Sequence, residues 1–359
     1  MNRRTRIVIG LILISILAFA STAMASIAPA PAYLELGETR TVDGDYSEWV
    51  TQADNPDNNV NDWFAAMYKA ANPNFPQLSS LYLSYDCQTQ IMYALVLVEG
   101  DGTALLNSNG EEHYVKIGST TLVDEGYGND GTVPDFNYIV DGPDIIGWEA
   151  SFSLAEGSYN NLNVHTQAYD DDDNLQTSAV EDRSVDLTVT CGSVGDYVWF
   201  DTGENGENGI QDEPPSAGVS NTPVELFKGS DDNVNDSPRL TDTTDSNGNY
   251  LFDDLPPGDY RVCFDITNQA TLRYTTSDDQ DSNIDPDPGS STYGCTEVFS
   301  LGIGEDDMTR DAGLLSGPTA IALASASTAA GSNSLVWVAA ALALALLTGV
   351  VLPRRRHNL

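Results

Sequence analysis

The run that decides the fold is Gly195-Asp196-Tyr197-Val198-Trp199-Phe200-Asp201, a β-rich stretch followed by a loop rich in Gly, Asn and Asp. Valine and aromatic residues favour strands, whereas Gly, Asp and Asn favour the turns between them. Further strand-like runs follow at residues 223–228, 249–252, 260–266 and 296–301. About 120 residues with this pattern fit one β-sandwich domain, which we predict over residues 192–315.

The region before this domain, residues 33–191, also has strand patterns. Residues 81–85 and 91–98 are two β-rich runs joined by a short polar segment, which predicts a hairpin. Alternating or β-rich runs recur at 113–117, 147–152, 162–169 and 185–190, whereas residues 63–70 suggest a short helix. The predicted fold class is therefore all-β, with two tandem β-sandwich domains and a C-terminal single transmembrane helix.

The N-terminus has the features of a secretory signal peptide. Arg3, Arg4 and Arg6 form a basic region, an apolar run covers residues 7–20, and Ala23-Met24-Ala25 is a small-x-small cleavage pattern. We expect cleavage after Ala25, so residues 1–25 form the signal and residues 26–32 a linker. An uncleaved anchor is the alternative, but the apolar run is short for a full span.

The C-terminus predicts a membrane anchor of one orientation. Residues 335–352 are apolar and uncharged, and long enough to cross a bilayer as a helix. Three arginines, Arg354, Arg355 and Arg356, follow at once, which places the stub at 353–359 in the cytoplasm. Residues 316–334, rich in Ala, Ser and Thr, form a spacer. The LPxTG motif of sortase substrates is absent, so covalent attachment to a cell wall is not predicted.

The exported part is strongly acidic. The chain has 15 Lys and Arg residues against 54 Asp and Glu residues, and six of the arginines lie in the two ends just described. Such a surface repels nucleic acid and anionic lipid, which excludes both as expected partners of the domains. It attracts divalent cations, although adaptation to a high-salt environment explains the composition equally simply.

Four cysteines, all in the exported part, allow three disulfide pairings. Two lie in each proposed domain, so we predict the pairs Cys87–Cys191 and Cys263–Cys295. The chain has no Cys-x-x-Cys pair and no Cys/His cluster, so a zinc site is not expected.

Three loops of the second domain carry oxygen-bearing side chains at close spacing. Calcium takes six to eight such ligands, and carboxylates this dense repel one another unless a cation neutralises them. We therefore predict structural Ca²⁺ sites, although solvated acidic turns are the alternative, since Asx and Gly are ordinary turn residues. The candidate ligands are Asp201, Asn205, Glu207, Asn208, Asp212, Asp245, Asn247, Asn249, Asp279, Asp281, Asn283, Asp285 and Asp287.

The same region resembles the SdrD B-like domains of bacterial serine–aspartate-repeat surface adhesins, which are related to the Cna B-type sandwich. The resemblance rests on motifs in a fixed order, which are residues 195–201, 208–213, 244–260, 278–285 and 304–314. It covers about a third of the chain and implies calcium sites in these loops and a place at the cell surface.

Two features depart from that family pattern. The first loop is two residues longer than usual, and Pro215 stands where a distal Glu is expected, so the first site is weakened or Glu213 substitutes. Some Cna B-type relatives carry Lys–Asn isopeptide bonds. Lys228 is the only lysine of this domain, and no such bond is predicted.

The first domain carries a shorter resemblance. Val42-Asp43-Gly44-Asp45-Tyr46-Ser47-Glu48-Trp49 and the strand at 147–154 are similar to family 9 carbohydrate-binding-module-like sandwiches. That resemblance implies sugar binding through exposed aromatic platforms, with Trp63, Tyr68, Tyr127 and Tyr138 as candidates. Trp49, Trp148 and Phe152 have the spacing of core residues instead. The acidic run at 170–174 is expected to be a solvated hairpin loop, with a peripheral calcium site as the alternative.

The sequence predicts a binding or structural protein and not an enzyme. Only His113 and His165 lie in the exported part, with no nucleophile motif and no phosphate-binding loop, although two catalytic carboxylates could be present among so many. Two hypotheses remain. One is a surface-anchored adhesion or structural protein with a calcium-stabilised second domain, and the other is a lectin-like receptor acting through residues 33–191. The expected partner is accordingly an extracellular protein or a glycan.

Overall fold

The computed structural model describes residues 29–49, 62–100, 102–106, 112–170, 172–201, 211, 214–231, 237–269, 272–274, 284–286 and 292–316. The predicted signal peptide and the predicted transmembrane helix at 335–352 lie outside these ranges. Apart from two short 3-10 helices, Glu181–Arg183 and Pro215–Ala217, the regular structure within them consists of strands. No helix of this described part is long and apolar enough to cross a membrane. The all-β prediction is confirmed.

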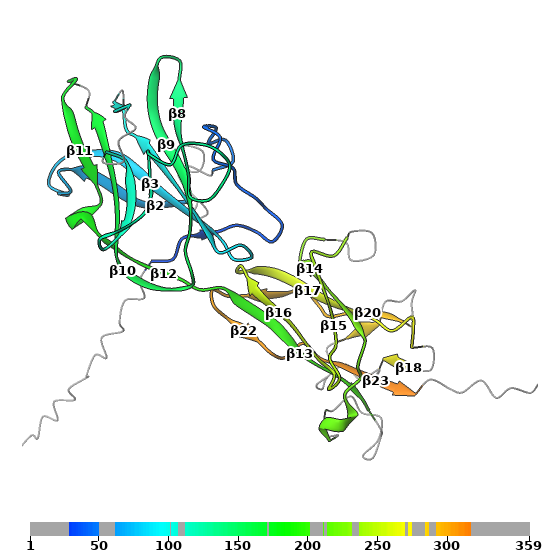
Figure 1. Cartoon of the computed structure of the whole chain (residues 1–359). Helices are drawn as coiled ribbons and strands as arrows, with labels where there is room; N and C mark the ends of the chain where they lie inside the picture. The colour runs from blue at the N-terminus through cyan, green and yellow to red at the C-terminus, as the bar shows by residue number, and fades with distance from the viewer. Residues whose placement is uncertain are drawn as a thin grey trace, which may run out of the picture.

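The first twelve strands belong to one sheet (Figure 1). Its main path runs β7-β6-β10-β11-β2-β3-β4-β9-β8, and β1, β5 and β12 pair with members of that path. The strands are β1 (Ala32–Tyr33), β2 (Trp63–Lys69), β3 (Gln77–Asp86), β4 (Ile91–Val98), β5 (Thr103–Ala104), β6 (Tyr114–Ile117), β7 (Thr120–Asp124), β8 (Asp135–Asp141), β9 (Asp144–Ser153), β10 (Gly157–Tyr169), β11 (Leu175–Ala179) and β12 (Val185–Val189).

This sheet is folded over a core that its two halves share. Leu81 and Leu83 of β3 lie in the same buried cluster as Val115 of β6 and Leu162 of β10. Tyr82, between the two leucines, belongs to a second cluster on the outer face of β3 and β4. Because side chains alternate between the faces of a strand, one run of apolar residues supplies both clusters. The first domain is thus layered like a sandwich although its strands form a single sheet.

The predicted hairpin is confirmed, and the predicted helix is wrong. Strands β3 and β4 pair in antiparallel register from Ser79↔Val98 to Asp86↔Ile91. Residues 63–69, which we expected to be helical, form β2, whose partners are β3 and β11. Alanine, methionine and lysine favour helices, but this intrinsic preference is small and is outweighed when the segment can complete a sheet and bury Met67 fully.

The remaining strands form a second sandwich of two sheets. One sheet has the order β16-β13-β23-β18 with β22 beside β13, and the other has the order β15-β14-β17-β20-β19 with β21 beside β17. These strands are β13 (Gly192–Phe200), β14 (Pro223–Lys228), β15 (Leu240–Thr243), β16 (Asn249–Leu255), β17 (Gly258–Asp265), β18 (Leu272–Tyr274), β19 (Asp285–Pro286), β20 (Tyr293–Cys295), β21 (Phe299–Leu301), β22 (Asp306–Asp307) and β23 (Ala312–Ser316).

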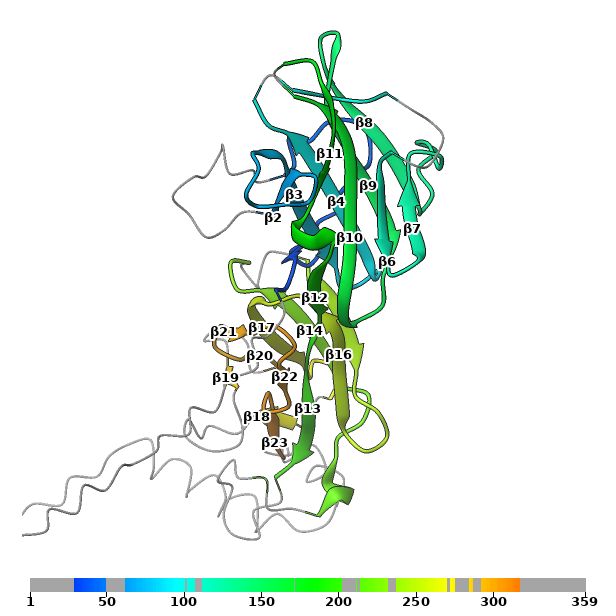
Figure 2. The ribbon, with the colours of Figure 1, turned by 90° about the vertical axis from the view of Figure 1, so that its left-hand side faces the viewer.

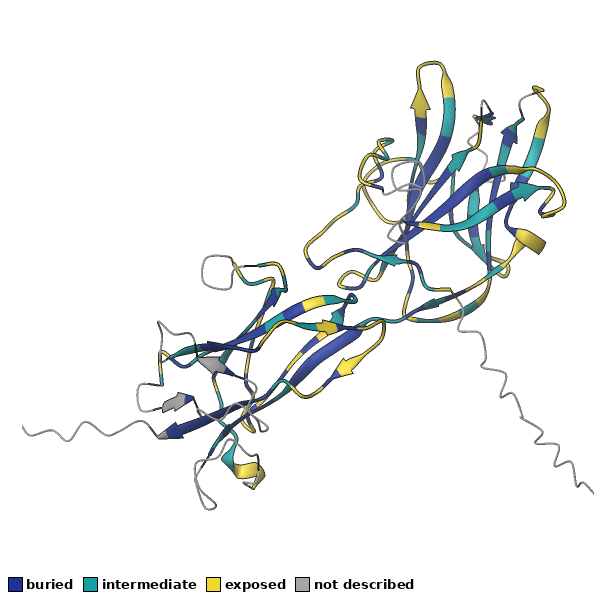
Figure 3. Cartoon of the chain, turned by 180° about the vertical axis from the view of Figure 1, so that it is seen from behind, coloured by how far each residue is buried: buried dark blue, intermediate teal, exposed yellow. Residues whose placement is uncertain are grey.

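The core of the second sandwich is drawn from both of its sheets. Val194 and Val198 of β13 and Phe252 of β16 pack in one cluster with Leu226 of β14 and Phe264 of β17. All five are buried. Figure 3 shows the same arrangement in both domains, with buried residues along the strands and exposed residues at the turns. The strand-like run at residues 195–200 is thus part of β13, a central strand of this domain.

Two disulfides are present, and they join the pairs predicted from the sequence. Cys263 and Cys295 lie directly opposite each other on β17 and β20. Cys87 follows β3, and Cys191 lies between β12 and β13, so the Cys87–Cys191 disulfide closes a separation of 104 residues. Only Thr190 and Cys191 separate the last strand of the first domain from the first strand of the second (Figure 2). The disulfide is therefore at the junction of the two domains.

Candidate functional site

The predicted calcium ligands are only partly within the described residues. Asp201 is 3% exposed at the end of β13, where its N–H donates to the carbonyl oxygen of Leu314 at 2.8 Å. The backbone of Asp285 forms part of β19. Eight candidates lie outside the described ranges: Asn205, Glu207, Asn208, Asp212, Asp279, Asp281, Asn283 and Asp287. Within the described ranges, no three His, Cys, Asp or Glu side chains form a metal-binding group.

The loop from Asp245 to Asn249 satisfies its own polar groups. The Asp245 carboxylate accepts hydrogen bonds from the backbone N–H groups of Asn247 at 2.8 Å and Asn249 at 2.9 Å. These bonds lower the pKa of Asp245. The arrangement is the Asx turn that we gave as the alternative to a calcium loop. The alternating side chains of this loop are thus explained without a cation, and the described part of the domain does not by itself assemble a calcium site.

The acidic run of the first domain is a hairpin loop, as expected. Strands β10 and β11 pair up to Tyr169↔Leu175, and the run lies between them. The Asp170 carboxylate accepts the N–H of Asn174 at 2.9 Å and lies 3.6 Å from the Lys69 ammonium. Hydrogen bonding to the loop lowers the pKa of Asp170. The contacts of Asp170 are those of a charged turn that organises its own backbone.

The Asp-Gly-x-x-x-x-Trp turn has a buried partner that the sequence did not reveal. Gly44 has a φ of +87°, and its N–H donates to the carboxylate of Glu149 on β9. A Cβ on Gly44 would lie 2.9 Å from the carbonyl oxygen of Tyr138, so the backbone of the turn sits directly on β8. Trp49, only 4% exposed, packs in the outer cluster of β3 and β4. The motif therefore fastens the N-terminal segment to the sheet.

Glu149 is an unusual carboxylate. It is 1% exposed, and its Oε2 atom has no hydrogen-bond partner within the described structure. Burial raises its pKa to about 7, and the nearby carboxylates of Asp43 and Glu48 add to that increase. The N–H groups of Gly44 and Asp43 oppose it. A buried polar group of this kind is costly to ionise, so Glu149 titrates close to neutral pH.

The Glu149→Gln variant is expected to change the pH dependence of stability. A carboxyl group whose pKa rises from 4.5 to about 7 on folding stabilises the native state fully below pH 4.5 and loses this contribution as the pH rises through 7. The free energy of unfolding falls by about 3 kcal/mol over this pH range. Relative to wild type, the variant should therefore gain about that much stability between pH 4.5 and 8, measured as urea midpoints. Parallel pH profiles for the two proteins would contradict this assignment.

His113 and His165 both lie in the core of the first domain. His113 is fully buried; its Nε2 lies 2.6 Å from the carbonyl oxygen of Leu105, and its Nδ1 lies 2.5 Å from Oγ1 of Thr166. Because a carbonyl can only accept, Nε2 carries the proton and Nδ1 accepts from Thr166, which in turn accepts from Trp148 at 3.0 Å. Burial lowers the pKa of His113. Every hydrogen bond in this chain forms when the His113 ring is neutral.

His165 has a similar structural role. Its ring stacks on Tyr114 with centroids 4.8 Å apart, and its Nδ1 lies 2.9 Å from the carbonyl oxygen of Glu112. Burial lowers the pKa of His165 to about 4, which gives it a stability contribution that is lost as the pH falls from 6.5 toward 4. This dependence has the opposite sign to that of Glu149. Neither histidine is arranged as an exposed acid or base.

The aromatic residues predicted as sugar platforms differ in exposure and come from different strands and turns of the first domain. Trp63 on β2 is 38% exposed, and Tyr127 after β7 is 48% exposed. In the strand order of the sheet, β6, β10 and β11 lie between β7 and β2. Tyr138 is half-buried and packs edge-on against Phe136, with centroids 5.2 Å apart, and Tyr68 is half-buried on β2. Trp148 and Phe152 are core residues, as expected.

The second domain holds one acidic pair that sequence reasoning missed. Asp196 on β13 and Asp311 before β23 hydrogen-bond through their side chains, and burial raises the pKa of Asp196. Asp311 is 6% exposed and accepts the N–H of Tyr197 at 3.1 Å. The two aspartates are 115 positions apart, so no local pattern could have linked them. They fasten the first strand of the domain to the segment that leads into its last strand.

Comparison with known proteins identifies the second domain. A fibrinogen-binding protein of Staphylococcus epidermidis is 35% identical over 130 residues, which are 34% of this chain and 11% of that protein. Serine-aspartate repeat-containing protein D of Staphylococcus aureus (strain Newman) is 29% identical over 233 residues, which are 62% of this chain and 15% of that protein. The chain thus spans less than a fifth of the length of either relative.

Among solved structures, the major pilin subunit BcpA of Bacillus cereus is 11% identical, and the match covers 62% of this chain and 64% of that one. Its TM-score of 0.24 is too low to indicate a shared fold. The family comparison is specific by contrast, and it covers the region in which the five ordered motifs lie. Residues 192–314 match the family model of the SdrD B-like domain, which confirms the resemblance found in the sequence for this part of the chain.

Proposed function

We propose that this chain is a cell-surface adhesion or structural protein in which the second domain is a spacer that presents the first. The observation that carries the proposal is the parallel pairing of the first and last strands of the second domain. Val198 pairs with Ala312 and Phe200 with Leu314. Because the strands run the same way, the chain leaves the domain at the end opposite to Gly192.

This geometry suits the second domain to the role of a spacer. Strand β13 has nine residues, which span about 26 Å at the usual rise of a strand. The first domain lies at one end of this span and the exit toward residues 317–359 lies at the other (Figure 2). A predicted signal peptide and a predicted membrane helix with a basic cytoplasmic end would anchor such a spacer with the first domain outermost.

The names of the relatives indicate the class of partner that we propose. One of them is named for binding fibrinogen, an extracellular protein, and two others are named serine-aspartate repeat-containing proteins. We therefore propose that the ligand of the first domain is an extracellular protein. We also propose Ca²⁺ as a structural cofactor of the second domain, because its sequence is dense in oxygen-bearing side chains. Asp201, which is buried, is the candidate ligand at the end of β13.

A lectin-like receptor is the second candidate. The exposed side chains of Trp63 and Tyr127 favour it, because carbohydrate sites use aromatic faces that water can reach.

Adhesion of cells that produce the full chain tests both candidates. The cells are applied to wells coated with extracellular matrix proteins or with glycans, in the presence of Ca²⁺. We expect adhesion to a protein that is blocked by antibodies against residues 29–191 and persists with antibodies against residues 192–314. Adhesion to glycans alone, lost in a Trp63→Ala or Tyr127→Ala variant, would favour the lectin. Absence of adhesion to any surface would contradict an adhesive role.

A further inference from the structure

The second domain contains a core residue that lies outside the region matched by its family. Leu36 belongs to the first domain by sequence, yet it is 4% exposed and packs in the cluster of Val194, Leu226 and Phe264. Leu34, two positions earlier, is 5% exposed and packs in the outer cluster of the first domain with Tyr82 and Leu95. One short segment therefore contributes to both cores.

The backbone holds this segment in a defined turn, residues 34–38. The N–H of Leu34 donates to the carbonyl oxygen of Tyr85 at 2.9 Å, which continues the pairing of β1 with β3. The N–H of Glu38 donates to the carbonyl oxygen of Glu35 at 2.8 Å, and the Glu38 carboxylate accepts the N–H of Glu35 at 3.1 Å. Gly37 has a φ of +86°, which glycine adopts readily. The turn is thus fixed to the first domain and projects Leu36 away from it.

The second domain offers a matching surface. Glu35 and Leu36 line one hollow with Lys228, Pro257 and Tyr260, which come from β14, from the β16–β17 turn and from β17. The Lys228 ammonium forms an ion pair with the carboxylate of Glu35. The Glu35 side chain is 62% exposed, so this pair orients the turn more than it stabilises the contact. Burial of Leu36 is the main attraction.

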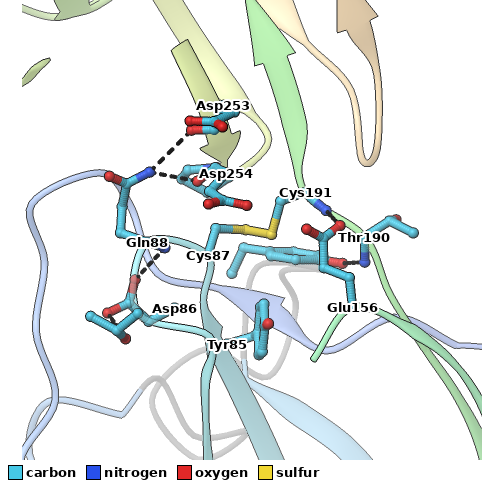
Figure 4. Close-up of a disulfide and its surroundings, with 12 residues drawn as sticks. Tyr85, Asp86, Cys87, Gln88, Glu156, Thr190, Cys191, Asp253 and Asp254 are labelled. Carbon is cyan, nitrogen blue, oxygen red and sulfur yellow. Dashed lines mark hydrogen bonds between the residues drawn. A yellow bond between two sulfur atoms is a disulfide. The ribbon is translucent and has the colours of Figure 1, made fainter. Parts of the chain in front are cut away.

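Two other attachments between the domains lie next to each other (Figure 4). At the tip of the β3–β4 hairpin, Gln88 donates through Nε2 to the carbonyl oxygens of Asp253 at 3.3 Å and Asp254 at 2.7 Å. Beside it, the Cys87–Cys191 disulfide ties the hairpin tip to the two-residue connection, and the N–H of Cys191 donates to the Glu156 carboxylate at 2.6 Å. Together with the turn at residues 34–38, these contacts hold the first domain to the second at the hairpin tip and at Leu36.

We infer that the turn at residues 34–38 couples the two domains, so that Leu36 of the first domain stabilises the fold of the second. The SdrD B-like domain of this chain is then not a self-sufficient module. Its core would be left open around Tyr260 if residues 192–314 were produced alone. The first domain is held in a fixed direction relative to the chain exit, whatever ligand it binds.

Hydrogen exchange of the full chain, read by mass spectrometry, tests the coupling with a matched pair of variants. Leu36→Ala should speed exchange in β13, β14 and β17 by about 10- to 100-fold, because a large buried side chain is lost from their core. Leu34→Ala removes the same side chain from the first domain and should act mainly on β3 and β4. Leu36→Val, a smaller change, should give the same pattern more weakly if the alanine variant does not fold.

The comparison between the two variants decides the outcome. Exchange in β13, β14 and β17 that is raised more by Leu36→Ala than by Leu34→Ala supports the coupling. Exchange there that Leu36→Ala leaves unchanged, or raises no more than Leu34→Ala does, overturns it.

Discussion

Replacement of Cys87 and Cys191 by serine is expected to lower the free energy of unfolding of the first domain by about 4.7 kcal/mol, the largest effect of any substitution considered for this chain. The disulfide closes a separation of 104 residues and so restricts the unfolded chain strongly. Removing it also frees the hairpin tip that contacts the second domain through Gln88. Calorimetry of the full chain should show the first domain unfolding at a clearly lower temperature.

The second disulfide supplies the control for this prediction. The Cys263→Ser and Cys295→Ser pair opens a separation of 32 residues, for which the same reasoning gives a loss of about 3.7 kcal/mol, and the loss should appear in the second domain. A calorimetric trace in which the Cys87 and Cys191 variant unfolds like wild type would show that the junction holds the first domain together without its covalent link.

The elements that could be predicted from sequence were those with strong local patterns. The β3–β4 hairpin has two long β-rich runs separated by a polar turn, and it forms as expected. Strand β2 was mistaken for a helix because its composition is ambiguous and its partners, β3 and β11, are not local. Pairing with strands far away in the sequence outweighs weak propensity, and a single sequence contains little information about such pairing.

The residues of the candidate sites also divide into those whose role could be predicted from the sequence and those whose role could not. An Asp followed by Asn at alternate positions predicts either a cation site or an Asx turn, and only the hydrogen bonds of Asp245 show that the turn accounts for this loop. Glu149 could not be predicted, because it lies about a hundred residues from the turn at Gly44 that it holds. Leu36 gave no signal either, since a leucine in a polar segment reveals nothing about which core receives it.

Calcium removal is the second change with a large expected effect. A ligand that binds only the native state at about 100 times its dissociation constant adds about 2.7 kcal/mol of stability. For a domain of this size, that corresponds to a rise of about 10 °C in the melting temperature. The full chain is the appropriate sample, because Leu36 completes the core of the second domain from outside residues 192–314.

A pair of aspartate variants makes the calcium assignment specific. Asp201→Asn removes one charge from the candidate ligand at the end of β13 and should reduce the calcium-dependent rise in melting temperature. Asp170→Asn removes one charge from the hairpin loop of the first domain and should leave that rise unchanged, since the contacts of Asp170 organise its own turn. Equal loss of the calcium response in both variants would indicate a general charge effect.

We propose that residues 192–314 form a calcium-stabilised spacer, and melting of that domain within the full chain tests this proposal. Calorimetry in millimolar Ca²⁺ and in excess EGTA should show the second-domain transition about 10 °C higher with calcium, and the first-domain transition nearly unmoved. Coincident second-domain transitions in the two solutions would contradict the claim, and the acidic loops would then be solvated turns.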